Sequence, residues 1–226
     1  LQRYQDLISY KLQNEINAFI NTLQSNPTDS SINASLQQMR GLNMLNTKYI
    51  IYNPQSQALL NKHAYGNAWF ADKILIADDA DEEMNLLLQI DLSKNAIINK
   101  SLIPNININD LEKDTNAIIQ LTSYHPEKLK YNVSTQTPQY IVFSEIYYPD
   151  WEAYIDGQKT DIYRTNYVLR GIEVPQGNHN IEFVFNPSVY KKGKLISLIF
   201  SIIVGSTIIV WLVWEAKKKK TDIIKE

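Results

Sequence analysis

The sequence predicts an α+β protein that combines a mixed α/β N-terminal half, an antiparallel β-sandwich and one C-terminal transmembrane helix. Helix-spaced and strand-like apolar runs alternate up to about residue 115, and short strands separated by turn residues follow it. Twenty residues without a charge then fill positions 195–214. We therefore expect four parts, with the boundaries 1–115, 116–189, 190–216 and 217–226.

The N-terminal half begins with apolar residues at helical spacing from Leu1 to Leu23, followed by a loop over Asn26–Ser30. Because amphipathic sequence starts at once, without a Met or a signal segment, we expect Leu1 to lie inside a longer protein. The further elements expected are a short helix over Ile32–Met39, strands over Tyr49–Tyr52, Trp69–Phe70 and Ile74–Ile76, a helix between Asp78 and Asp91, and a strand over Ala96–Ile98. The acidic run Asp81-Glu82-Glu83 is typical of a solvated helix start.

The second half contains seven predicted strands, and their regular spacing favours an antiparallel β-sandwich. The strands are Ala117–Thr122, Leu129–Ser134, Tyr140–Tyr147, Glu152–Ile155, Thr160–Arg164, Val168–Val174 and Asn180–Phe185. Alternate apolar residues from Ile181 to Phe185 give the last strand one buried face. Asp156-Gly157 predicts a two-residue hairpin turn, and Pro175-Gln176-Gly177-Asn178 predicts a second tight turn.

The uncharged segment 195–214 is long enough to cross a bilayer, because a helix of this length spans ~30 Å. Three lysines precede it within 191–194, and Lys217–Lys220 follow it. Residues 1–190 carry 14 Lys and Arg against 21 Asp and Glu, whereas residues 191–226 carry 8 against 3. The four-lysine run favours a cytoplasmic C-terminus, which places residues 1–190 outside the cytoplasm, although the lysines before the helix weaken this contrast.

The composition argues against several kinds of site. Cysteine is absent, which removes thiolate ligands and cysteine nucleophiles. His63, His125 and His179 are scattered without the spacing of metal ligands. The sequence has neither a Gly-rich phosphate loop nor a GxSxG nucleophile motif, and the acidic range 1–190 offers no basic face for nucleic acid. We therefore predict no catalytic residue, no metal and no cofactor in this chain.

An aromatic stretch around residue 150 is the strongest candidate for binding. Tyr147, Tyr148 and Trp151 are close together in the sequence, and exposed Tyr and Trp side chains stack on sugar rings. Glu145 flanks the stretch, and Arg170 on a later strand has the charge to pair with it or to bind an anionic lipid or phosphate. The alternative is that these side chains only fill or cover a sandwich core, with Arg170 in a structural ion pair.

The same stretch resembles the C-terminal signature of YfhO-type bacterial membrane proteins. The similarity is carried by Val142–Gly157 (VFSEIYYPDWEAYIDG) and by Ile162–Gly171 (IYRTNYVLRG). Leu42–Ile51 (LNMLNTKYII) and Gly66–Phe70 (GNAWF) resemble two further blocks of that family. One departure is Asp150, where the family more often has Gly; Asp also tolerates tight turns.

The resemblance implies a multi-spanning glycosyltransferase of the GT-C type. Such enzymes take a sugar from a polyprenyl-phosphate donor and pass it to a cell-envelope glycan or lipid at the outer face of the bacterial inner membrane. Their essential acidic residue lies in the first external loop, which would be upstream of Leu1, so this chain would be a non-catalytic end that packs with the upstream membrane region. Two alternatives remain: a membrane-tethered β-sandwich that binds glycans or an envelope partner without catalysis, and the external cap of a lipid-carrier transporter.

Overall fold

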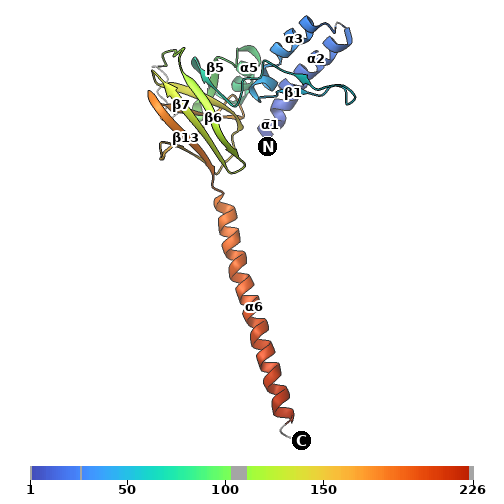
Figure 1. Ribbon diagram of the computed structural model, residues 1–226, viewed down its shortest axis with the longest axis vertical. Helices are drawn as coiled ribbons and strands as arrows, with labels where there is room; N and C mark the ends of the chain where they lie inside the picture. The colour runs from blue at the N-terminus through green and yellow to red at the C-terminus, as the bar shows by residue number, and fades with distance from the viewer. Residues whose placement is uncertain (1, 26, 103–110, 224–226) are drawn as a thin grey trace. The chain divides into compact units, whose positions relative to one another are not determined.

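The structure is a computed structural model that describes residues 2–25, 27–102 and 111–223 (Figure 1). Its contacts divide the chain into two units, Leu1–Phe185 and Asn186–Glu226. The boundary that we predict at residue 115 falls inside the first unit, because strands from both sides of that residue join one sheet.

The helical segment at the N-terminus is drawn in blue in Figure 1. It consists of α1 (Gln2–Leu7), η1 (Ile8–Leu12), α2 (Gln13–Ser25), α3 (Asp29–Gln38) and α4 (Arg40–Met44). The helix predicted from Leu1 to Leu23 is thus interrupted by η1, a π-helical turn in which Lys11 is buried and its Nζ donates to the Leu87 carbonyl at 2.9 Å. α3 begins earlier than predicted because Thr28 forms a capping box with Ser31.

A six-stranded mixed sheet combines strands from both halves of the sequence, in the order β3-β8-β12-β11-β5-β4. Its strands are β3 (Ala68–Ala71), β4 (Lys73–Ala77), β5 (Asn95–Asn99), β8 (Gln139–Ile146), β11 (Tyr163–Thr165) and β12 (Leu169–Val174). The parallel pair β4 and β5 is joined by α5 (Ala80–Gln89), which is capped by the Asp79 side chain. The small elements β1 (Tyr49–Ile50), β2 (Leu59–Leu60) and η2 (Lys100–Leu102) lie outside this sheet.

The second sheet is five-stranded and antiparallel, in the order β10-β9-β13-β7-β6. Its strands are β6 (Ile118–His125), β7 (Lys128–Thr135), β9 (Trp151–Ile155), β10 (Gln158–Thr160) and β13 (Gly177–Phe185). The predicted hairpin at Asp156-Gly157 is confirmed: it joins β9 to β10, and both residues have positive φ, 50° and 82°.

At two connections the chain passes from one sheet to the other. The segment predicted as one strand over Thr160–Arg164 is two strands, β10 and β11, which belong to different sheets. Pro175 and Gln176 likewise connect β12 in the six-stranded sheet to β13 in the five-stranded one. The tight turn that we predict over Pro175–Asn178 is thus a short connection that passes from one sheet to the other.

Strand β8 lies between two hydrophobic cores. Ile141 and Phe143 point into the core between the two sheets, which confirms the predicted sandwich. Tyr140 and Val142 point to the opposite face, where the core also includes Leu7 of α1 together with residues of η1 and α5. The first unit thus has three layers, with helices on one face of the six-stranded sheet and the five-stranded sheet on the other.

The second unit is a single helix, α6 (Ser188–Ile223). Its segment Lys192–Trp214 is long and apolar enough to cross a membrane, and none of the side chains in that window is buried within the structure. A helix of this length that is apolar on all sides is typical of a membrane span. The helix therefore indicates membrane association, as the sequence predicts.

Candidate functional site

Arg170 is the centre of a polar and aromatic cluster at one end of the sandwich. Its side chain is only 3% exposed, and its Nε donates to the Ile146 carbonyl at 3.0 Å. The guanidinium carbon lies 4.1 Å from the centre of the Trp151 ring, which is the stacked geometry that stabilises a desolvated cation. A register shift between Leu169 and Arg170 in the β8–β12 ladder marks a bulge, and bulges re-aim side chains near functional sites.

The electrostatics of the cluster follow from burial. Burial lowers the pKa of Arg170 to about 10, and the negative charge of Glu145 opposes this shift. Glu145 also raises the pKa of the Tyr124 phenol, through its charge and a hydrogen bond. Within the described residues, Arg170 forms no direct ion pair, so its charge is balanced at a distance by Glu145.

Two buried groups in this cluster have unused hydrogen-bonding capacity. The Nη1 atom of Arg170 and the Oη atom of Tyr131 find no hydrogen-bond partner in the described part of the chain. Such groups are rare in folded proteins, because an unpaired buried donor costs ~1–3 kcal/mol. The cluster therefore combines one buried cation, one nearby carboxylate and two buried donors without a partner among the described residues.

An aromatic edge adjoins the cluster. Tyr148 is 57% exposed, and its ring centre lies 6.2 Å from that of Phe185. Trp151 contacts the same Phe185 ring, with the centres 5.3 Å apart. The structure thus brings together four of the predicted site residues, namely Glu145, Tyr148, Trp151 and Arg170.

Tyr147 does not join this cluster. Its backbone N–H donates to the Val168 carbonyl at 2.7 Å, and its phenol lies near Arg164 instead. The reason is that β8 ends at Ile146, so strand alternation no longer applies to the next residue.

A second buried cluster lies around Glu83, which corrects the interpretation of the acidic run as fully solvated. Glu83 is completely buried and accepts from the Tyr167 backbone N–H at 3.0 Å and from Arg3 Nη1 at 2.7 Å. Helical spacing places it on the inner face of α5 with Leu87, where these two donors replace water. Tyr167 has φ of 74°, which is unfavourable for an aromatic residue, so Glu83 stabilises a strained turn.

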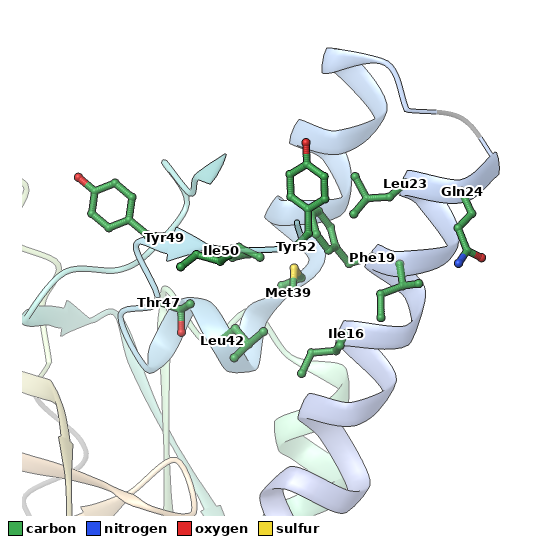
Figure 2. Close-up of a pocket in the computed structure, with 12 residues that line it drawn as sticks. Ile16, Phe19, Leu23, Gln24, Met39, Leu42, Thr47, Tyr49, Ile50 and Tyr52 are labelled. Carbon is green, nitrogen blue, oxygen red and sulfur yellow. The ribbon is translucent and has the colours of Figure 1, made fainter. Parts of the chain in front are cut away.

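The chain also contains an apolar pocket of about 710 Å³ between α2, α4 and the β1 region (Figure 2). Phe19 and Leu23 project from α2 toward Met39, and Ile50 lies across from them. Our sequence reasoning did not identify this pocket. The signal that would have found it is the run Tyr49–Tyr52, which has more consecutive apolar residues than a two-residue strand can bury.

Comparison with known protein families shows the family to which the chain belongs. A sequence model of the family described as "Bacterial membrane protein YfhO" matches residues 13–197, which is most of the chain. The chain belongs to the YfhO family. The uncharacterized protein YfhO of Bacillus subtilis (strain 168) is 29% identical to it over 91 residues. That alignment covers 37% of this chain and 11% of the length of the relative.

The part of the chain that matches the YfhO family includes both candidate sites. It begins at Gln13, the first residue of α2, and so contains the whole lining of the apolar pocket. It also contains the Arg170 cluster and the first residues of the candidate span. Asp150, where the resemblance predicts Gly more often, has φ of 72°, a conformation that Gly adopts most easily.

The described residues offer no evident metal site. Among residues 2–25, 27–102 and 111–223, no group of three or more His, Asp or Glu side chains is arranged to hold a metal ion. The hydrogen-bonded pair of His179 and Asp156, with Nδ1 and Oδ2 2.7 Å apart, lies at the β9–β10 turn.

Proposed function

We propose that this chain is the extracytoplasmic C-terminal region and last membrane span of a multi-spanning YfhO-family glycosyltransferase. The parent protein would use a polyprenyl-phosphate-linked sugar and act on cell-envelope glycans or lipids at the bacterial inner membrane, with the C-terminus of α6 in the cytoplasm. Family membership and the apolar helix α6 support the membrane assignment. The alignment covers only 11% of the Bacillus relative, which supports a parent protein longer than this chain.

In this proposal the chain contributes no catalytic residue and instead orients the acceptor at the Arg170 cluster. The observation that carries it is a buried arginine without a direct ion pair that stacks on Trp151 beside the exposed ring of Tyr148. Aromatic rings contact the C–H faces of sugars, and Glu145 accepts hydrogen bonds from hydroxyls. The buried Arg170 stacks on Trp151 and so fixes the position of that ring. Such a combination suits the sugar part of a glycan or of a lipid glycan.

The experiment is a glycosyl-transfer assay with the full-length parent protein in membranes, in which Tyr148→Ala is compared with the wild type. Loss of an exposed stacking ring removes ~0.5–1.5 kcal/mol of contact, so we expect transfer to fall about two- to tenfold at limiting acceptor. Tyr10→Ala is the matched control, because Tyr10 is 62% exposed and lies outside the cluster. Both variants should keep the thermal midpoint of the wild type.

Two results would contradict the proposal at different levels. A parent protein that transfers no sugar from any polyprenyl-phosphate donor tested would remove the enzymatic assignment. Transfer by Tyr148→Ala that equals transfer by Tyr10→Ala would leave the enzyme but remove the acceptor site.

A second candidate function is a membrane-tethered glycan-binding module without catalysis. The same aromatic edge of Tyr148 and Trp151 supports it, since stacking on a sugar requires no catalytic group. Binding of envelope glycans by the chain in nanodiscs, together with no transfer by the parent, would favour this module over the enzyme.

A further inference from the structure

We propose that the apolar pocket between α2, α4 and β1 binds the aliphatic chain of a membrane lipid. This inference does not rest on glycosyl transfer, because it concerns a different surface and a different chemistry. The pocket volume of about 710 Å³ lies within the ~300–1,000 Å³ that small-molecule sites occupy.

The lining of the pocket determines the class of ligand. Among the residues that the structure describes, none of the side chains that line the pocket carries a charge. Apart from the tyrosine hydroxyls, the polar groups in the lining belong to Gln24 and Thr47. A phosphate or a sugar would lose its water here without receiving comparable hydrogen bonds, which is costly. The favourable occupant is therefore an uncharged hydrocarbon group.

The floor and the rim of the pocket differ in burial. Phe19 and Met39 form a buried floor and belong to a small hydrophobic cluster separate from the two main cores. Ile20, Ile51 and Tyr52 remain exposed, with 41%, 71% and 52% of their surfaces accessible. Figure 2 shows Tyr52 near Phe19. Apolar residues that gather around a hollow, rather than lying singly on the surface, mark an interaction site.

The membrane helix supplies the argument for a lipid. α6 carries a span of Lys192–Trp214, so the protein resides at a bilayer, where aliphatic chains are the most abundant apolar molecules. Binding of one chain would cover the exposed rim at Ile20 and Ile51 at the same time. It would also extend the thin cluster around Phe19 and Met39 into a larger core.

The test is photolabelling of the full 226-residue chain in nanodiscs with an uncharged long-chain alcohol that carries a diazirine near its end. Peptides from α2 and from residues 47–52 should be labelled, and peptides from α6 serve as the internal reference because they contact lipid directly. Ile20→Asp places a short, unpaired charge in the lining and should lower pocket labelling about tenfold or more. Leu88→Asp is the matched control, since Leu88 is a 45% exposed helical residue outside the pocket.

The outcomes separate the proposal from a folding defect. Loss of labelling in Ile20→Asp with the same unfolding midpoint as Leu88→Asp supports the proposal. If Ile20→Asp unfolds more easily, Ile51→Asp replaces it, because Ile51 is exposed at the rim. The proposal would be overturned if the pocket peptides of the wild type were labelled no more than peptides from β6 and β7. It would also be overturned if Ile20→Asp, or Ile51→Asp where it replaces that variant, left the labelling of the pocket unchanged.

Discussion

Replacement of Gly171 by Ala should disrupt the contact that joins β8, β11 and β12. Gly171 lies on β12 directly over the Tyr140 hydroxyl, which is hydrogen-bonded to Thr165 Oγ1 at 2.6 Å. A Cβ at this position would overlap the Tyr140 hydroxyl and lie 2.5 Å from Thr165 Oγ1. Both neighbours are fully buried, so neither can swing into solvent.

The magnitude follows from two effects. Overpacking of a filled core costs ~1–3 kcal/mol. Displacement of the Tyr140 hydroxyl would also leave buried polar groups unpaired, which costs a further ~1–3 kcal/mol. We therefore expect Gly171→Ala to lower the free energy of unfolding by about 2–6 kcal/mol, a large part of the ~5–15 kcal/mol that stabilises a typical domain.

The assay is urea unfolding of the full chain in detergent micelles, followed by near-UV circular dichroism. Gly193→Ala is the control, because a Cβ there meets no atom within 4 Å and helical Ala is favoured over Gly. In a Tyr140→Phe background the cost of Gly171→Ala should shrink by ~1 kcal/mol, since one clashing atom is gone. A Gly171→Ala variant as stable as the control, or a strictly additive double variant, would refute the reasoning.

Two further predictions concern pH and helix capping. The hydrogen bond with Asp156 raises the pKa of His179, and bonds from Asn180 and His179 lower the pKa of Asp156. The stability from His179 is therefore present below about pH 6.5 and is lost as pH rises through its raised pKa, while that from Asp156 is lost as pH falls below about 3.8. The thermal midpoint of the wild type should thus exceed that of His179→Asn most clearly between about pH 3.8 and pH 6.5. A difference in midpoint at pH 8 as large as the difference in that range would contradict this assignment. Asp79→Ala removes the cap of α5 and should cost ~0.5–2 kcal/mol in urea unfolding, whereas Asp79→Ser should restore most of it; equal loss in both would argue against a capping role.

Features set by neighbouring residues could be predicted from the sequence. The Asp156-Gly157 hairpin is one, because a turn with two positive φ values selects residue types that tolerate them. The buried face of β13 is another, since Ile181 and Phe183 alternate with outward positions and both point into the sandwich core. The membrane helix is the third, because its length and lack of charge depend on no distant partner.

Features that depend on distant partners could not be predicted. β3 pairs with β8, and Thr165 of β11 pairs with Ile98 of β5, although these strands are far apart in the sequence. Local patterns carry no information on such pairings. The burial of Glu83 requires Arg3, which is 80 positions away.

In the candidate site, too, some features depend on neighbouring residues and others on distant ones. Aromatic composition alone pointed to Tyr148 and Trp151, and the structure places both rings against Phe185. The proximity of Glu145 to Arg170 depends on the register of β8 and β12 and on the bulge between them. Tyr147 departs from the group because β8 ends one residue earlier, a boundary that spacing alone does not fix.

The central position of β13 has a mechanical consequence. The chain passes from Phe185, the last residue of β13, to α6, so a pull on the membrane helix is applied to the end of this strand. β13 is hydrogen-bonded to β7 on one side and to β9 on the other. Withdrawal of this strand would break both ladders, whereas withdrawal of an edge strand would break only one. The globular unit is thus attached to its membrane helix through a strand that is held on both sides.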